Sequence, residues 1–305
     1  MSRVKVSALV ANCSARKSAK AAAELSSAAL TSGIQDAVAR QWMDKVAAAR
    51  ATAKASELYM GRGVKRMHQL ADRFNVPLYI ASAGLGLLTA SEIVPSYDLS
   101  VSSGNPAAVQ RRIIGGFVAQ HWWAAVQQSK YARPISDLFR KHDRGLVLIA
   151  VSNAYVPLLV GDLSKLPNTQ RDRLRLFGAA DAKYPADLRP FLMPYDARLD
   201  LLVRGSKVDF AQRAAEHFLL AAATEEAFPI QLDEQRKWVE VELSRVTVKA
   251  REKREAVDDV RIREIAKELA HQGLSYTKAL NTLRRQHGIA CEQSRFRRLF
   301  LEATT

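Results

Sequence analysis

The run GLVLIAVSN, residues 145–153, carries the clearest secondary-structure signal in the chain. Its six apolar residues, 146–151, follow a glycine and end at a Ser-Asn pair. A short, unbroken apolar run between turn residues predicts a strand that is buried on both faces, as in a parallel sheet. The polar residues that follow it, SNAY, therefore fall at the carboxyl end of a central strand.

Similar strands are expected on both sides of this run in the sequence. Residues 4–10 are apolar and β-branched and stop at ANCSARK, and VPLYIAS at 76–82 leads into SAGLGLL. DRLRLFGA at 172–179 predicts a fourth strand, and ARLDLLV at 197–203 leaves a fifth possible. Repeated strands of this kind predict an α/β domain with a mostly parallel central sheet.

Helices are expected to connect and cover these strands. Alanine-rich sequence at 17–58 has high helix propensity throughout, interrupted at Gly33, and a further helix is expected at 63–74. Residues 106–130 also read as helical, with Trp122 and Trp123 in the core. Residues 209–227 are amphipathic. Together these elements predict a helix-flanked α/β domain at 1–228.

Composition changes after Pro229. Residues 229–257 are highly charged and predict a connecting helix, although the alternation in VEVEL leaves a strand possible. Residues 258–305 predict three short helices separated by Gly273 and Gly288, with Ser275 as a cap. Such a unit is typical of a helix-turn-helix module.

The charge of the chain favours a polyanionic partner. The net charge is +15, and nucleic acid is the first candidate for such a basic protein. Six C-terminal cations lie within residues 273–301, a segment with a single acidic residue, Glu292. They are Lys278, Arg284, Arg285, Arg295, Arg297 and Arg298. We expect them to bind double-stranded DNA; a solvated basic face is the alternative.

Several function classes are excluded by motif. GLGLLT has threonine where a dinucleotide fingerprint needs a third small residue, and no phosphate-binding GxxxxGK[ST] loop occurs. The two cysteines and six histidines have no zinc spacing, so neither a metal nor a small-molecule cofactor is expected. No apolar run is long enough to span a membrane, no signal peptide is evident, and a cytoplasmic location is expected.

Three polar loops are expected to meet at one edge of the sheet, because parallel strands end there together. Each residue taken alone is more typical of a turn or capping residue than of a catalyst. Together their amides, rings and carboxylates could form a nucleobase pocket. The candidates are Asn12, Cys13, Ser14, Lys17, Ser82, Gly84, Gly86, Glu92, Tyr97, Asp98, Ser152, Asn153 and Tyr155.

Three separated elements in the first hundred residues carry a resemblance to a known group. They are NCSARK, ASELYMGRGVKRM at 55–67, and YIASAGLGLLTASEIVPSYDLSV at 79–101. In this order they resemble YaaA-like peroxide-stress proteins and a domain of archaeosine synthases, which are thought to share the uracil-DNA glycosylase-like fold. The resemblance implies that fold and a glycosylase-like pocket. The G-Q-D-P-Y and H-P-S-P motifs of uracil-DNA glycosylases are absent, which favours a larger or modified base.

We therefore expect a DNA glycosylase that flips and excises a modified base, such as hypermodified cytosine of phage DNA, in antiviral defence. Asp98 is expected to stabilise the sugar cation, Asn12 to position the base or water, and Tyr97 to stack on the base. Ser14, Lys17 and the turn at 82–86 are expected to hold phosphates. The alternatives are a DNA-binding regulator of a mobile element and a tRNA or deazaguanine-type base-modifying enzyme.

Overall fold

The computed structural model describes residues 4–140, 145–178, 184–247 and 254–304. It divides the chain into two compact units, Met1–Thr247 and Val248–Thr305. The first holds a five-stranded sheet in the order β4-β3-β1-β6-β7. These strands are β1 (Val6–Asn12), β3 (Leu78–Ser82), β4 (Gly86–Thr89), β6 (Leu146–Ala150) and β7 (Leu174–Phe177). All pair in parallel except β4, which is antiparallel to β3, so the predicted α/β class is confirmed.

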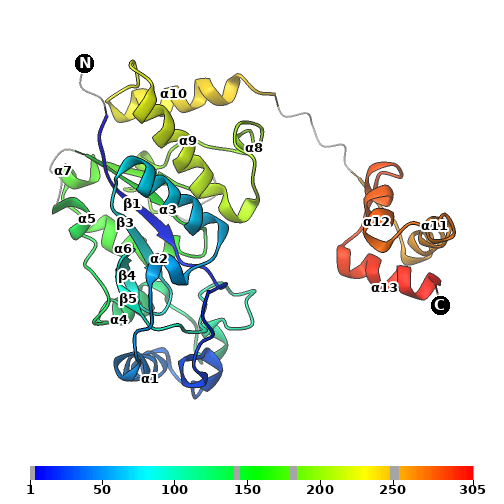
Figure 1. Cartoon of the computed structure of the whole chain (residues 1–305), viewed down its shortest axis with the longest axis horizontal. Helices are drawn as coiled ribbons and strands as arrows, with labels where there is room; N and C mark the ends of the chain where they lie inside the picture. The colour runs from blue at the N-terminus through cyan, green and yellow to red at the C-terminus, as the bar shows by residue number, and fades with distance from the viewer. Residues whose placement is uncertain (1–3, 141–144, 179–183, 248–253, 305) are drawn as a thin grey trace. The chain divides into compact units, whose positions relative to one another are not determined.

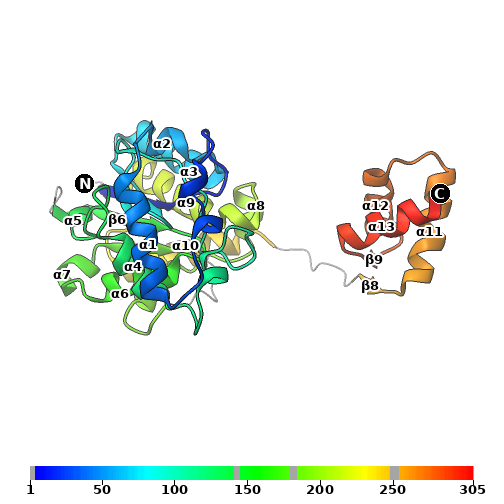
Figure 2. The same cartoon turned by 90° about the horizontal axis from the view of Figure 1, so that it is seen from below.

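Helices bury both faces of this sheet, and every residue of β6 is buried. On one face α3 (Arg62–Phe74) and α9 (Phe210–Thr224) lie side by side and contact β1 and β6 (Figure 1). Helix α4 (Ala119–Val126) packs against both α1 (Gln35–Ala48) and α6 (Val156–Ser164), and Figure 2 shows α1 beside α4. Trp122 and Trp123 are buried in α4, as expected.

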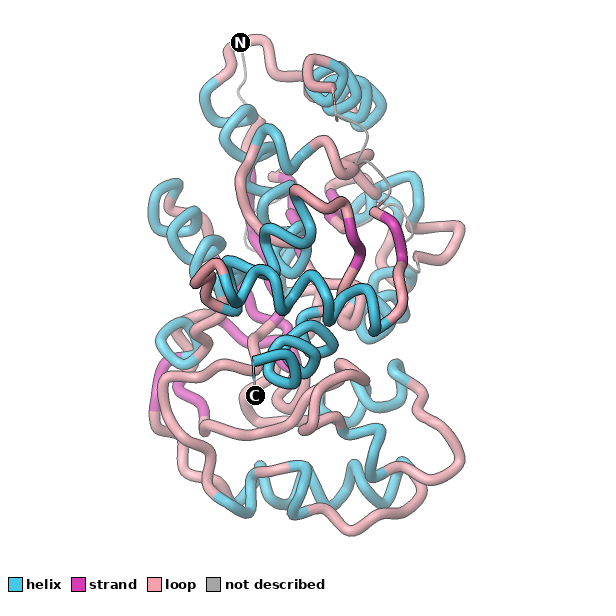
Figure 3. The backbone as a smooth tube through the Cα atoms, turned by 90° about the vertical axis from the view of Figure 1, so that its right-hand side faces the viewer, coloured by secondary structure: helices cyan, strands magenta, loops and turns pink. Residues whose placement is uncertain are grey.

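Short elements and loops complete the unit, and loops make up much of the backbone in Figure 3. The short helices are α2 (Ala55–Leu58), α5 (Asp137–Arg140), α7 (Asn168–Arg171) and α8 (Leu199–Leu202). A small ladder joins β2 (Ala53–Lys54) to β5 (Ile93–Val94). Five single turns of 3₁₀ helix lie at Ala23–Leu25, Ser27–Ala29, Val109–Arg112, Arg189–Phe191 and Lys207–Asp209.

The expectation of helix throughout residues 17–58 was wrong for the first half of that segment. Residues 17–33 are mostly extended and contain two 3₁₀ turns. Their backbone pairs with distant segments instead: Lys17 with Tyr59, Ser26 with Asp98, and Gly33 with Ile113. These tertiary hydrogen bonds outweigh the weak intrinsic preference of alanine for helix.

Two further expectations fail for local reasons. Residues 106–130 form only a 3₁₀ turn and α4, because Gly115 and Gly116 both adopt positive φ angles, +89° and +105°, and interrupt the segment. The possible fifth strand at 197–203 is the short helix α8. Just before it, Asp196 Oδ1 accepts a hydrogen bond from the backbone N–H of Arg198 at 2.9 Å, the pattern of an Asx turn.

The glycine turn at 82–86 is a buried hairpin rather than an open loop. Gly86 has φ +81° and starts β4, which continues the sheet beyond β3. Trp42 Nε1 donates to the carbonyl of Gly84 at 2.7 Å, and Trp122 Nε1 donates to that of Ala83 at 2.8 Å. The turn is therefore covered by two indole rings.

Replacing Gly84 by alanine is expected to destabilise the protein by about 1–3 kcal/mol through overpacking. A Cβ atom there would lie 2.8 Å from Cζ2 of Trp42 and 3.0 Å from Cε2 of Tyr97. Gly104 is the matched control, because a Cβ there meets nothing within 4 Å; Gly104→Ala should stay within about 0.5 kcal/mol of the wild type. Urea unfolding measures both, and equal stabilities would contradict the packing described.

The boundary between the units lies near Thr247, not at Phe228, because the charged segment folds onto the α/β unit. It forms helix α10 (Leu232–Ser244), not a strand, and its Val239 and Leu243 are buried. Arg175, buried in β7, donates from Nε to the side-chain oxygen of Gln235 in α10. Burial lowers the pKa of Arg175 to about 10, so it still carries its charge at neutral pH.

The second unit has a core of its own. It consists of α11 (Asp259–His271), α12 (Tyr276–Arg285) and α13 (Gln293–Thr304), with a two-residue parallel ladder between β8 (Glu255–Ala256) and β9 (Ile289–Ala290). The helix boundaries at Gly273 and Gly288 are as expected, with φ +74° and +65°. Ser275 occupies the N-cap position of α12, although its side chain makes no capping hydrogen bond. Apolar stripes on the three helices form this core: Ile262, Ile265, Ala266, Leu269, Leu280, Leu283, Phe296, Leu299 and Phe300.

Candidate functional site

A cavity of about 400 Å³ opens at the carboxyl ends of β1 and β6. The chain leaves β1 toward β3 on one side and later returns to β6 on the other side of β1. Ligand sites of open α/β sheets form at this reversal of strand order. The predicted loops after β1 and β6 line the cavity through Asn12 and Ser152, and the start of α3 forms another wall.

Asn12 ties the two strand ends to α9. Its Oδ1 accepts hydrogen bonds from the backbone N–H of Ser152 at 2.9 Å and from Nε2 of Gln212 at 3.1 Å. Its Nδ2 donates to the carbonyl of Cys13 at 2.9 Å. Asn12 therefore lines the cavity as expected, but its amide is mainly engaged in holding the wall together.

Gln212 is the second amide of this wall and is buried, with 2% of its surface exposed. Its Nε2 also donates to the carbonyl of Ala150 at 2.8 Å, so the amide orientation is fixed by two acceptors. Its Oε1 is buried and has no hydrogen-bond partner in the described part of the chain. A Cβ on Gly63 would lie 2.9 Å from this oxygen, so a larger residue there would force the amide to shift.

Asp209 places a carboxylate in the cavity lining, with 2% of its surface exposed. Its Oδ1 accepts from the backbone N–H of Ser206 at 2.7 Å and from the Ser206 hydroxyl at 3.0 Å. Arg213 Nε lies 3.4 Å from Oδ1, and Arg66 lies 3.9 Å from Oδ2. Burial alone would raise the pKa of Asp209, but Ser206 and then the two arginines outweigh it and lower this pKa. Asp209 is thus an anion at neutral pH.

Ser14 fixes the start of α3 against the end of β1. Its hydroxyl accepts from the backbone N–H of Gly61 at 2.9 Å and donates to the carbonyl of Arg16 at 2.7 Å. Arg62, the first residue of α3, lines the cavity beside it. The predicted phosphate contact of Ser14 would compete with these two bonds, so its visible role is to shape the wall.

Behind Cys13 lies a buried cluster of hydroxyl groups. The Cys13 sulfur lies 3.0 Å from Tyr155 Oη and 3.4 Å from Tyr97 Oη. Tyr97 Oη lies 2.7 Å from Ser82 Oγ, which in turn is 3.0 Å from Tyr59 Oη. Burial first, then the Coulombic effect of Cys13, raises the pKa of Tyr97 and Tyr155 well above their usual range. Both phenols are therefore neutral hydrogen-bonding groups.

Tyr97 and Asp98 point to different surroundings. Only 1% of Tyr97 is exposed, and its ring packs edge-on against Trp42 and Tyr59, so it does not offer a free face for base stacking. Asp98 is exposed and lines a second hollow of about 540 Å³ together with Lys17. Asp98 does not line the cavity that contains Asn12.

The remaining predicted loop residues lie away from the cavity. Glu92 accepts a hydrogen bond from Arg133 Nη2 at 2.8 Å. Asn153 is exposed and is not part of the cavity lining, although its neighbour Ser152 is. Ser82, Gly84 and Gly86 are buried, so the predicted phosphate contacts of this turn and its glycines are not available at the surface.

The six C-terminal cations fall into two groups. Arg284 donates from Nε and Nη2 to the carbonyl of Cys291 at 3.2 and 2.7 Å, and Arg295 and Arg298 bind acidic residues within the unit. Lys278, Arg285 and Arg297 are exposed and make no hydrogen bond or ion pair with the residues that the structure describes. The last three are the cations free to meet a partner.

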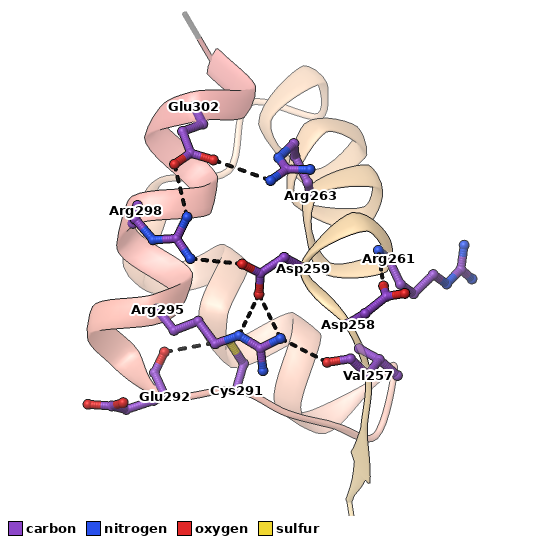
Figure 4. Close-up of polar contacts among 10 residues, drawn as sticks. All are labelled: Val257, Asp258, Asp259, Arg261, Arg263, Cys291, Glu292, Arg295, Arg298 and Glu302. Atoms are coloured by element: carbon purple, nitrogen blue, oxygen red, sulfur yellow. Dashed lines mark hydrogen bonds and ion pairs between the residues drawn. The ribbon is translucent and has the colours of Figure 1, made fainter.

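Asp259 is the centre of the internal network in this unit (Figure 4). Arg295 Nε donates to its Oδ1 at 2.7 Å, and Arg298 Nη2 donates to its Oδ2 at 2.8 Å. Arg298 also binds Glu302 at 3.1 Å. The hydrogen bonds from Arg298 and Arg295 lower the pKa of Asp259. These arginines hold α13 against the start of α11.

Several lining residues escaped sequence analysis: Arg62, Ser100, Ser102, Asn105, Ser206, Asp209 and Gln212. One local signal was present for part of this set. Ser206 and Asp209 have the S-x-x-D spacing of a capping box before an apolar helix. That motif locates the start of α9, although it does not show that this helix start faces the ends of β1 and β6.

No family model, curated protein or solved structure matches this chain. Among the residues described, no cluster of three or more His, Cys, Asp or Glu side chains could hold a metal ion. None of the described helices is both long and apolar enough to cross a membrane.

Proposed function

We propose that this protein is a DNA glycosylase that takes a flipped, modified base into the cavity between the ends of β1 and β6. The observation that carries the proposal is the buried carboxylate of Asp209 in a cavity lined by the amides of Asn12 and Gln212. The resemblance of three N-terminal elements to glycosylase-like proteins supports the same function.

The cavity has the size and chemistry of a small-ligand site. Its volume of about 400 Å³ lies within the range of roughly 300–1,000 Å³ usual for such sites. Ser102, Asn105 and Ser152 line the cavity, and their hydroxyl and amide groups can hydrogen-bond to a polar base edge. A base must leave the duplex to enter a pocket of this kind, because its reacting bond is otherwise inaccessible.

Asp209 supplies the charge that the reaction needs. When the N-glycosidic bond breaks, positive charge develops on the deoxyribose ring, and a nearby carboxylate stabilises it. Water then adds its hydroxyl to C1′, while the base leaves with the bonding electrons and takes the proton of that water. Ser206 and Arg213 hold the carboxylate in place. Asp209 therefore replaces Asp98 as our proposed catalytic carboxylate.

The C-terminal unit supplies binding to the DNA backbone. Three of its exposed cations, Lys278, Arg285 and Arg297, suit phosphate contacts that do not depend on sequence. We propose that this three-helix unit binds duplex DNA in the manner of a helix-turn-helix module and keeps the α/β unit near its substrate.

Purified protein incubated with phage DNA that carries modified cytosine should produce abasic sites. Treatment with an abasic-site lyase then converts each of them into a strand break, and unmodified DNA of the same sequence should stay intact. DNA binding without breaks on any modified or damaged substrate would favour a regulator of a mobile element. Base modification of RNA, or a product without abasic sites, would favour a base-modifying enzyme. Either result overturns the proposal.

A further inference from the structure

Lys17 occupies an unusual position beside the cavity. Its Nζ lies 4.3 Å from the ring centroid of Tyr97 and 5.8 Å from that of Tyr59. Its backbone is anchored by a bridge to Tyr59, and the N–H of Ser18 donates to the carbonyl of Leu58 at 2.9 Å. The amine is thus held by aromatic faces on a fixed stretch of chain rather than extended into solvent.

No carboxylate of the described residues forms an ion pair with this amine, although Asp98 lines the same hollow. Desolvation lowers the pKa of Lys17; the charges of Cys13 and Asp98 oppose this shift only in part. A larger share of the amine is therefore unprotonated than for a solvated lysine. Unprotonated lysines of this kind are the ones that add to carbonyl groups.

The hollow that contains Lys17 adjoins the cavity that contains Asn12, and Ala15 lines both. The segment that follows β1 lines both spaces: Cys13 and Ser14 line the cavity, while Lys17 and Ser18 line the hollow. A nucleotide whose base occupies the cavity would carry its sugar to the mouth of that cavity. Lys17 lines the adjoining hollow, so its amine is the candidate to meet the sugar carbon from which the base has left.

We infer that Lys17 forms an imine with the C1′ aldehyde of an abasic deoxyribose in DNA. The inference rests on the proposed function for the origin of the aldehyde, and it adds a second step at the same site. The Nζ nitrogen adds to C1′ of the ring-opened sugar, and the aldehyde oxygen then leaves as water with both amine protons. A covalent C=N bond joins the protein to the DNA strand.

Preformed abasic DNA tests this inference without requiring base excision. The full-length protein is mixed with a duplex that holds one abasic site, and sodium borohydride reduces any imine to a stable amine. A protein–DNA adduct is expected on a denaturing gel, and mass spectrometry of the digest should place it on Lys17. Absence of an adduct, or an adduct mapped to another amine, overturns the inference.

Two variants sharpen the test. Lys17→Arg keeps a positive charge over the Tyr97 ring but cannot form an imine, so adduct yield should fall at least tenfold. Lys20→Arg is the matched control, because Lys20 lines the same hollow but is exposed; its yield should equal that of the wild type. Equal yields in all three proteins refute a role for Lys17, and unchanged DNA affinity shows that the variants are folded.

The outcomes also separate this inference from the proposed function. An adduct on preformed abasic DNA together with no excision from modified DNA would contradict the proposed glycosylase activity and still support imine formation by Lys17. Excision without an adduct would support the glycosylase activity and refute imine formation by Lys17.

Discussion

Asp209→Asn is expected to lower the rate of base excision by about 10²–10³-fold, the usual effect of removing one electrostatic group that acts on the transition state. The variant keeps the shape of the site. The asparagine Oδ1 can still accept the hydrogen bond that the backbone of Ser206 donates at 2.7 Å. What it removes is the negative charge that, in the proposed mechanism, stabilises the sugar cation. Single-turnover measurement of abasic sites on modified DNA gives the rate.

Asp98→Asn is the matched control for this experiment. Asp98 is exposed and lies outside the cavity lining, so the excision rate should remain within about twofold of the wild type on the general expectation for surface substitutions. A loss of activity in Asp98→Asn with full activity in Asp209→Asn would reverse our assignment. Thermal unfolding of both variants shows whether a change in rate reflects catalysis or folding.

Combined replacement of Lys278, Arg285 and Arg297 by alanine is expected to give the largest loss of DNA affinity. These side chains are exposed and have no protein partner among the described residues. If each binds one phosphate, the slope of log affinity against log salt should become shallower by about one unit per residue. Titration of labelled duplex DNA at several salt concentrations measures both the affinity and the slope.

The control for this experiment is the double change Arg295→Ala and Arg298→Ala. Both side chains bind Asp259 (Figure 4), so their removal should mainly lower the stability of the three-helix unit. We therefore expect earlier thermal unfolding of that unit, whereas the triple variant should unfold like the wild type. An unchanged salt slope in the triple variant would show that its three cations do not contact phosphates.

The elements that sequence analysis located correctly are those whose signal is local. The buried strands β1, β3 and β6 are short, mostly apolar runs between turn residues, and β7 is a similar run that contains Arg175. The C-terminal helices carry regular apolar stripes closed by glycines. The structure confirms both. Residues 17–33 were mispredicted because their backbone pairs with partners such as Asp98 and Ile113 that are remote in sequence.

The same contrast between local signals and long-range contacts explains which site residues were predicted from the sequence. Strand ends placed Asn12 and Ser152 at one edge of the sheet, because parallel strands end together. Tyr97 and Asp98 were assigned to one site as neighbours, yet successive residues of an extended chain point to opposite sides, and one is buried while the other is exposed. Asp209 was missed because nothing in its local sequence indicates that it lies near the ends of β1 and β6.

The bond between Asn12 and Gln212 joins residues 200 positions apart in the chain. During synthesis from the N-terminus, β1 and its polar loop emerge long before the helix that completes the cavity wall. Contacts of such long range form slowly, because the chain must first close a large loop. The cavity wall thus stays incomplete until α9 has left the ribosome and docked, so an interrupted chain ending before residue 210 contains β1 without the completed cavity.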